Sequence, residues 1–358
     1  MSFSVLNEFI VAILIGIIQG LTEFLPISST AHLDLFGRLF LSGRDFGLST
    51  SNIIQFGTTI ALLIYFKDDL KPLVVQLKNI LTKANDFRNW LSDTKIWWST
   101  KASNIFHDSS SITGLDEKRL GYSDRVKQNL LLTQLAIATI PIAILGLFLQ
   151  KYVDSSLRGP GFVAVFLSLG AGLLMLAENL SQKFKQTKNT QNVNESELNP
   201  LSLSRDQVIL IGLFQSMAIF PGMSRSGSTI AGSLIIGLNR PQAARFAFLV
   251  GIPALFLSSL KDLFEILFKN INRLHFLPEE KYWDKLVVQN IKVVDPKVEF
   301  SLAAIFLATL LSFIFGYISL KWLIKYISKV STNKFSYYRF GLSFVILMYL
   351  LLASIFKF

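Results

Sequence analysis

The sequence lacks cysteine altogether, holds three histidines, and has few charged residues for a chain of 358. The absence of cysteine excludes disulfides, thiolate metal sites and a cysteine nucleophile. Charged residues make up 16% of the chain, whereas soluble domains carry about 25%. Hydrophobic residues account for 51%. These proportions indicate an integral membrane protein.

The scarce charges are mainly positive, with a formal net charge of +11. In a soluble protein this excess would suggest nucleic-acid binding. Here most Lys and Arg lie between apolar stretches, where the cytoplasmic loops of membrane proteins collect them. We therefore expect membrane lipids, and no nucleic acid, as partners. No basic segment or cleavage site precedes the first apolar run, so we expect no removable signal peptide.

Seven long stretches contain no charged residue, and an eighth, shorter one stops at Glu23. About 20 apolar residues cross the hydrocarbon core as a helix, and lipid offers no partner for unpaired backbone groups. The stretches are Phe46–Tyr65, Gln128–Gln150, Gly159–Ala177, Gln207–Ser224, Phe246–Leu260, Phe300–Leu320 and Phe340–Phe356, with the shorter Phe9–Thr22. The pattern predicts an all-α polytopic membrane protein.

Two apolar stretches run into polar, turn-forming residues. The first continues as EFLPISSTAH at 23–32, and the second contains PGMSRSGST at 221–229. Proline breaks a helix, and Gly and Ser favour turns. At membrane depth such a break is tolerated only inside protein or beside a wet cavity. We interpret each as a re-entrant hairpin of two half-helices, at about 5–40 and 206–238.

The two breaks align without a gap, so that Gln19 matches Gln215 and Ser28 matches Ser224. Three apolar spans follow each break, and an odd number of crossings inverts the second half. We expect six transmembrane helices plus two re-entrant helical hairpins in inverted-topology repeats. The repeats are residues 1–180 and 206–358, the polar linker is 181–205, and polar insertions lie at 67–127 and 269–299. Because 67–127, 181–205 and 325–334 hold more Lys and Arg, we place them in the cytoplasm and both termini outside.

Glu23 and Arg225 are charges inside the two broken segments. A charge at the centre of a membrane helix costs roughly 2.5–3.5 kcal/mol, so it needs a cavity or a partner. One interpretation is an ion pair that pins the two hairpins together. The other is a functional site, because the fork of Arg225 fits phosphate oxygens.

Hydroxyl groups are dense in both breaks and could either satisfy freed backbone groups or bind a ligand. Backbone N–H groups at the start of a half-helix bind anions, which favours a phosphate cradle. The candidate binding residues are Ser28, Thr30, Ser224, Ser226, Thr229, Gly222 and Gly227, and Ser29 joins Glu23 and Arg225 as a catalytic candidate.

His32 is the only histidine in an apolar segment and follows Ser28 and Ser29 at helical spacing. It suits a base that activates a hydroxyl, or a nucleophilic imidazole. Gln19 and Glu23 are four residues apart and would share a helix face. Their oxygens suit a divalent metal ion, Mg²⁺ or Ca²⁺, that also holds phosphate oxygens.

The segments QGLTEFLPISSTAH at 19–32 and FPGMSRSGST at 220–229 resemble the two signature motifs of the undecaprenyl-diphosphate phosphatase family, also called the bacitracin-resistance protein. QFGT at 55–58 and FLVGIP at 248–253 extend the resemblance. It implies six spans and two re-entrant hairpins, and metal-dependent hydrolysis of undecaprenyl diphosphate to the monophosphate. It also implies a site open to the outer face of the bacterial plasma membrane.

Carried over by position, Glu23 matches the second acidic residue of the first motif and Arg225 the phosphate-binding arginine. Ser29 and His32 match the nucleophile candidates, and Ser224, Ser226 and Thr30 match further polar residues of the family's site. Many members have Glu where this chain has Gln19, which puts a two-carboxylate metal site in doubt here.

A transporter is the main rival, because inverted repeats with broken helices at the midplane are typical of transporters. A bifunctional protein that hydrolyses the diphosphate and flips the product is a second alternative. A membrane scaffold would leave the hydroxyl, Arg and His cluster unexplained. The sequence does not determine whether the chain acts alone or as a homodimer.

Overall fold

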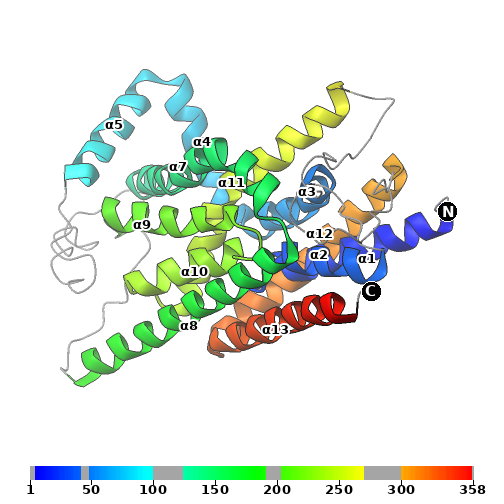
Figure 1. The fold of residues 1–358 in the computed structure, drawn as a ribbon. Coiled ribbons are helices and arrows are strands. Elements are labelled where there is room, and N and C mark those ends of the chain that lie inside the picture. Colours follow the sequence, from blue (N-terminus) through cyan, green and yellow to red (C-terminus); the bar gives the residue numbers. More distant parts are fainter. Residues whose placement is uncertain (1–4, 42–47, 100–123, 191–202, 270–299, 357–358) are drawn as a thin grey trace.

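The computed structural model describes residues 5–41, 48–99, 124–190, 203–269 and 300–356 (Figure 1). These residues form helices and no strand. Among them, five segments are long and apolar enough to cross a membrane: Asn129–Leu149, Pro160–Lys183, Arg240–Lys261, Leu302–Ile327 and Asn333–Ile355. A further apolar segment, Ser51–Tyr65, is shorter. The predicted all-α polytopic membrane protein is confirmed, while the count of six spans stays a prediction.

The helices that carry these apolar segments form the body of the molecule. They are α3 (Leu48–Tyr65), α7 (Asp124–Ser156), α8 (Pro160–Thr190), α11 (Arg240–Lys269), α12 (Leu302–Ile327) and α13 (Asn333–Phe356). Their outward faces expose large apolar side chains such as Leu147, Phe306 and Phe344. Such a surface suits lipid, because hydrocarbon chains replace the water that would otherwise contact it.

The two predicted breaks interrupt helices. Residues 24–28 separate α1 (Val5–Glu23) from α2 (Ser29–Phe40). α9 (Arg205–Ser216) leads through a short 3₁₀ turn, η3 (Met217–Ile219), and residues 220–224 to α10 (Arg225–Ile236). Each break contains a proline, which cannot donate a helical hydrogen bond. That the two helix pairs turn back inside a membrane stays a prediction.

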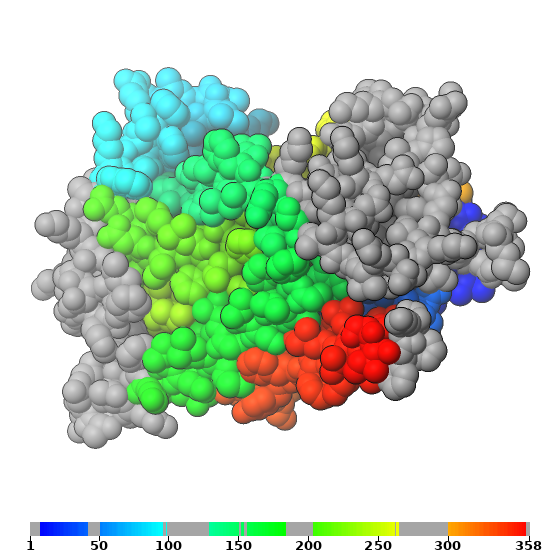
Figure 2. All heavy atoms as spheres, viewed as in Figure 1, coloured from blue at the N-terminus to red at the C-terminus, as the bar shows by residue number. Residues whose placement is uncertain are grey.

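The two halves of the chain interlock. α1 packs on α12, and α9 packs on α7, so each hairpin lies against a helix from the other half. α3 lies beside α11 (Figure 1). α8 lies beside α13, as the green and red surfaces of Figure 2 show. On α1, a side chain at Gly16 would overlap the Ala308 carbonyl of α12, so the small residue permits close packing. That the two halves are repeats of opposite orientation, with the boundaries given above, stays a prediction.

The start of the first polar insertion forms α4 (Lys67–Thr82) and α5 (Ala84–Ser99), which pack on α7. Gln76 Nε2 donates to Asn129 Oδ1 at 2.9 Å, and Asn129 Nδ2 donates to Asp93 Oδ2 at 2.7 Å. The rest of that insertion, most of the linker and the insertion near 270–299 lie outside the described residues. The start of α1 and the end of α13 lie toward the same end of the molecule in the view of Figure 1. That both termini lie outside the cell stays a prediction.

Candidate functional site

The two breaks share one backbone conformation. Ser28 has φ 72° and ψ 97°, and Ser224 has φ 66° and ψ 110°. Within the described part of the chain, they are the only residues other than glycine with positive φ. Each serine caps the helix that follows, because its Oγ accepts from the N–H three residues later, at 3.4 Å from Ala31 and 3.2 Å from Gly227. These are the two serines that the gap-free alignment pairs.

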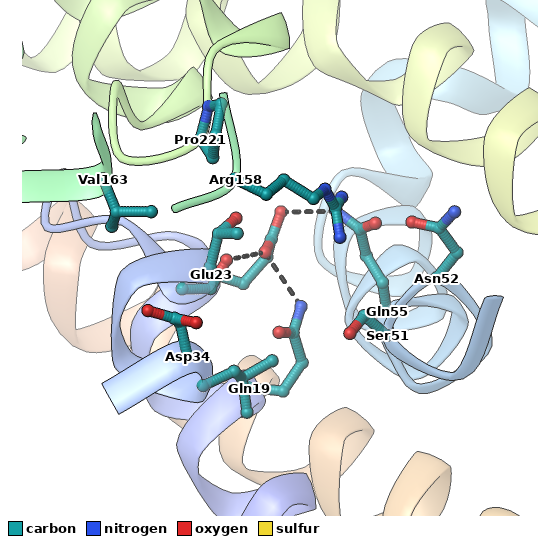
Figure 3. Close-up of a pocket in the computed structure, with 12 residues that line it drawn as sticks. Gln19, Glu23, Asp34, Ser51, Asn52, Gln55, Arg158, Val163 and Pro221 are labelled. Atoms are coloured by element: carbon teal, nitrogen blue, oxygen red, sulfur yellow. Dashed lines mark hydrogen bonds between the residues drawn. The ribbon is translucent and has the colours of Figure 1, made fainter. Parts of the chain in front are cut away.

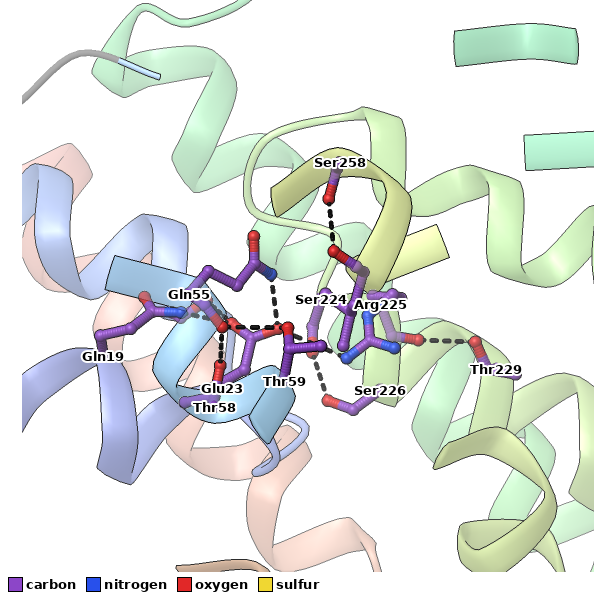
Figure 4. Close-up of polar contacts among 12 residues, drawn as sticks. Gln19, Glu23, Gln55, Thr58, Thr59, Ser224, Arg225, Ser226, Thr229 and Ser258 are labelled. Carbon is purple, nitrogen blue, oxygen red and sulfur yellow. Dashed lines mark hydrogen bonds and ion pairs between the residues drawn. The ribbon is translucent and has the colours of Figure 1, made fainter. Parts of the chain in front are cut away.

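Glu23, the last residue of α1, joins four elements (Figure 4). Its Oε2 accepts from Gln19 Nε2 at 2.9 Å and from Ser29 Oγ at 2.7 Å. Its Oε1 accepts from Gln55 Nε2 of α3 at 2.9 Å and from an Arg225 Nη at 3.3 Å. A buried charge is stable only when it is paired and fully hydrogen-bonded, and Glu23 meets that condition.

The Glu23–Arg225 ion pair connects the first break to the second. The side chain of Glu23 is 5% exposed and that of Arg225 is 11% exposed. The guanidinium of Arg225 lies against Gly251 of α11, where a Cβ atom would overlap it. The ion pair suggested by the sequence is therefore present. It does not exclude a functional role, because Glu23 also lines the pocket described next.

A polar pocket of about 100 Å³ opens beside Glu23 (Figure 3). Its lining combines two carboxylates, three hydroxyl side chains, three amides and an arginine. These are Glu23, Asp34, Ser29, Thr30, Ser51, Gln19, Asn52, Gln55 and Arg158, with Leu33, Val163 and Pro221 as apolar neighbours. The first break and the start of α3 supply most of the polar groups.

The hydroxyls of the second break lie outside this pocket and bond to protein groups. Ser226 Oγ donates to the Leu25 carbonyl at 3.1 Å and lies 3.2 Å from Ser224 Oγ. Thr229 Oγ1 donates to the Arg225 carbonyl at 2.8 Å. These three residues therefore behave as in the first of the two interpretations, in which the hydroxyls bond to groups of the protein itself. Their predicted role in substrate binding stays a prediction.

The glycines of the second break have structural tasks. Gly222 has φ 101°, and a Cβ atom there would overlap the Val163 carbonyl of α8. The backbone N–H of Gly227 donates to Ser224 Oγ. Both glycines therefore shape the break that leads into α10, in keeping with their predicted place beside an anion site.

His32 of α2 faces α13 instead of the pocket. Its Nδ1 lies 2.7 Å from the Ser28 carbonyl oxygen, and its Nε2 lies 2.7 Å from the Tyr338 hydroxyl. A carbonyl oxygen only accepts, so Nδ1 carries the proton in the neutral ring and Nε2 accepts from Tyr338. The unprotonated nitrogen that a base or nucleophile needs is therefore directed at the Tyr338 hydroxyl, and His32 does not line the pocket.

Few side chains at this site could coordinate a divalent metal ion. The described residues contain no group of three or more His, Asp or Glu side chains that could hold an ion. The amide nitrogen of Gln19 donates to Glu23, which leaves the amide oxygen of Gln19 for other partners. Mg²⁺ is often held by one or two carboxylates together with substrate phosphates. Glu23, Asp34 and the Gln19 oxygen fit that type of site.

Sequence reasoning missed several residues that the fold brings to this region. Gln55 belongs to a segment that resembles the family, but we assigned it no function. Arg158 lies between two apolar stretches and was not singled out. Tyr338 and Arg339 precede the last apolar stretch and resemble ordinary residues at a helix end. Only the charge of Arg339 beside a charge-free run offered a signal.

Comparisons with known proteins identify the family of the chain. The family described as "Bacitracin resistance protein BacA" matches residues 12–345. A Chloroherpeton thalassium protein named "Undecaprenyl-diphosphatase" is 32% identical over 97% of this chain and 99% of its own length. A Micrococcus luteus protein of the same name is 32% identical over 92% of each chain. The chain therefore belongs to the bacitracin resistance protein BacA family.

Proposed function

We propose that this chain hydrolyses undecaprenyl diphosphate to undecaprenyl phosphate and inorganic phosphate, which recycles the lipid carrier for cell-wall synthesis. The relatives named undecaprenyl-diphosphatase span nearly the whole chain. The observation that carries the proposal is the hydrogen bond from Ser29 Oγ to Glu23 Oε2 at 2.7 Å, with Arg225 on the other oxygen. A nucleophile, its base and a cation for phosphate oxygens thus meet at one point.

In the first step, Ser29 Oγ attacks the terminal phosphorus while its proton passes to Glu23. The bond from that phosphorus to the bridging oxygen breaks, and undecaprenyl phosphate leaves. Water then cleaves the phosphoserine and releases inorganic phosphate. Arg225 and the N–H groups at the start of α2 stabilise the negative charge on the transferring phosphoryl group.

His32 is the second candidate nucleophile, because its Nε2 is unprotonated in the neutral ring. If His32 attacks, the intermediate is a phosphohistidine, which acid destroys, whereas a phosphoserine survives acid. If water attacks directly, no phosphoenzyme forms, and His32 or Glu23 takes the proton of the water. Trapping with labelled substrate therefore separates the three routes.

The metal site proposed for Mg²⁺ or Ca²⁺ consists of Glu23, the Gln19 amide oxygen and Asp34, completed by the phosphates of the substrate. When bound, the ion neutralises phosphate charge and makes the phosphorus easier to attack. Because Glu23 already accepts four hydrogen bonds, at least one of these donors must yield its place to the ion.

The proposed location is the bacterial plasma membrane, with the site open to the outer side. Ser51, Asn52 and Arg158 line the pocket. In sequence they adjoin 41–48 and 151–158, which fall on the outer side when the crossings are counted from the predicted cytoplasmic placement of 67–127. The polyprenyl tail of the substrate would lie against the apolar outer faces of the helices. A homodimer stays a prediction.

The test is phosphate release from undecaprenyl diphosphate by the purified protein in detergent. The wild type should release one phosphate per substrate molecule. Ser29→Ala and Glu23→Gln should lower kcat about 100-fold or more. His107→Ala is the control, because His107 belongs to a polar insertion. Full activity of both Ser29→Ala and His32→Ala would contradict the proposed roles.

Detergent also separates the enzyme from its main rival. A transporter needs two compartments, so it would bind the lipid diphosphate without releasing phosphate in detergent. If the wild type releases no phosphate at any metal concentration, the proposed hydrolysis is contradicted and the transporter interpretation is favoured.

A further inference from the structure

Two consecutive residues of α13 contact the two breaks separately. Tyr338 bonds to His32 of the first break, and Arg339 bonds to the backbone of the second. In sequence, Tyr338 lies 306 positions after His32. α13 itself packs along α8 and supplies no residue to the pocket lining.

Arg339 is fully buried, with 0% exposure. One of its Nη atoms donates to the carbonyl oxygens of Gly222 and Met223, at 3.1 and 2.9 Å. These two carbonyls directly precede Ser224, the residue held at positive φ. A residue in that conformation costs of order 1–3 kcal/mol and persists only where its surroundings enforce it. A single Nη atom of Arg339 thus bonds to both carbonyls that lead into the strained residue.

The rest of the guanidinium has no hydrogen-bond partner within the described residues, since both Nε and the other Nη are buried and unbonded. That Nη atom points toward the start of α10, where a Cβ atom at Gly227 would lie 3.0 Å from it and 3.4 Å from Pro26. A Cβ atom at Gly170 of α8 would overlap the guanidinium, so a glycine there makes room for it.

The charges around the second break do not balance. Arg225 is paired with Glu23, but no described carboxylate pairs with Arg339. The start of α10 adds the partial positive charge of a helix N-terminus. Two unsatisfied donors and a net positive field remain beside the break. A diphosphate in the neighbouring pocket would supply the missing negative charge.

Tyr338 has the complementary task at the first break. Its hydroxyl lies 2.7 Å from His32 Nε2, and the two rings stack at 5.7 Å with an interplanar angle of 4°. The Ser28 carbonyl fixes Nδ1 from the other side of the ring. The imidazole is therefore held in one tautomer and one orientation by groups on both nitrogens.

We infer that Tyr338 and Arg339 are positioning residues of the phosphate site: Tyr338 orients His32, and Arg339 holds the Gly222–Met223 backbone while supplying positive charge behind it. The inference rests on the proposed hydrolysis and deepens it. One turn of α13 keeps the two breaks in a fixed relation, although it contacts neither the pocket nor its ligand.

The experiment measures kcat and KM for phosphate release from a short polyprenyl diphosphate by the purified full chain. Tyr338→Phe keeps the ring and loses the hydroxyl, so kcat should fall about tenfold with KM unchanged. Arg339→Met removes both the guanidinium group and its charge. We expect kcat to fall about 100-fold because the second break is no longer held, and KM to rise because the positive charge is lost. Arg339→Lys keeps the charge, so it should restore KM but not kcat.

The matched controls leave both breaks untouched. Tyr337→Phe removes the hydroxyl of the neighbouring residue, Tyr337, which is 64% exposed. Ser343→Ala loosens the packing of α13 on α8, because Ser343 Oγ donates to the Ala164 carbonyl at 2.7 Å. If Tyr338→Phe matches Tyr337→Phe and the Arg339 variants match Ser343→Ala in both constants, the inference is overturned. If Arg339→Met does not fold, Arg339→Lys decides by the same comparison with Ser343→Ala.

The wild type reports separately on the proposed function. If it releases no phosphate, hydrolysis is refuted whatever the variants do. The inference is then tested by thermal unfolding with and without inorganic pyrophosphate. Pyrophosphate should raise the Tm of Ser343→Ala by more than that of Arg339→Met, because the methionine variant lacks the positive charge behind the break. Equal shifts of these two variants would overturn the role of Arg339.

Discussion

At the scale of single residues, the Glu23 carboxylate sets what the site can do. Four donors from α1, α2, α3 and α10 meet its two oxygens. Arg225 balances its charge, and Ser29 lies where its proton can be taken. Because Glu23 is proposed as base and metal ligand, substitutions that disturb its four donors test these proposed roles directly.

Gln19→Glu would place a second carboxylate beside Glu23, at the position where many members of the family have Glu. Without metal, two carboxylates would face each other where an amide now donates at 2.9 Å, so we expect a lower Tm. With Mg²⁺ or Ca²⁺ the repulsion is relieved, so the Tm should rise with metal more steeply than in the wild type. Thermal unfolding across metal concentrations measures this. Gln55→Glu is the control, and a flat metal response in Gln19→Glu would argue against metal binding here.

Gly251→Ala should displace the guanidinium of Arg225, because the added Cβ atom would overlap it. The ion pair with Glu23 would break, and kcat/KM should fall about 100-fold, as it does when a group misplaced by 1 Å no longer meets the substrate. Gly172→Ala is the control, since nothing lies within 4 Å of a Cβ atom there. Equal activity of the two alanine variants would show that Arg225 can shift without loss.

At the scale of helices and breaks, the sequence carried most of the information. Proline, glycine and serine inside apolar runs marked both breaks, because few other residues tolerate that backbone. The lone membrane charges Glu23 and Arg225 called for partners, and their pairing was one of the two interpretations weighed. The tasks of Tyr338 and Arg339 could not be foreseen, since they depend on how α13 packs against both breaks. The orientation of His32 toward α13 was hidden for the same reason.

The shared backbone at Ser28 and Ser224 makes a prediction about stability. Alanine removes the capping hydroxyl and keeps the strain of positive φ, whereas glycine removes the hydroxyl and relieves the strain. Ser224→Ala should therefore be less stable than Ser224→Gly by about 1 kcal/mol or more, and the Ser28 pair should behave alike. Chemical unfolding in detergent measures the difference.

The control for this comparison is Ser301, an N-cap with an ordinary φ of −64° whose Oγ accepts from Ala304 at 3.3 Å. There the alanine and glycine variants should differ by only a few tenths to about 1 kcal/mol, the range for caps without strain. If the gap at Ser224 is no larger than the gap at Ser301, the positive φ stores no measurable strain.

At the scale of the whole molecule, the two ends differ. The polar pocket lies near the start of α8, at Arg158 and Val163. Further along α8, Glu178 is 1% exposed and accepts from Arg240, Ser331 and Thr332. A buried, fully bonded carboxylate of this kind joins α8, α11 and the turn before α13. One end thus carries the polar pocket, and the other carries a buried carboxylate that is paired with Arg240.

The orientation of these two ends across the membrane can be tested by thiol labelling. The chain has no cysteine of its own, so an introduced cysteine is the only residue that a maleimide labels. Ser51→Cys places a thiol in the pocket lining, and Lys329→Cys places one on the exposed turn between α12 and α13. In intact cells, a membrane-impermeant maleimide should label Ser51→Cys at once, and inorganic pyrophosphate should slow that labelling. Lys329→Cys should react only after the membrane is permeabilised. The reverse labelling pattern would show that the pocket faces the cytoplasm. The site would then not be open to the outer side, which contradicts the proposed location.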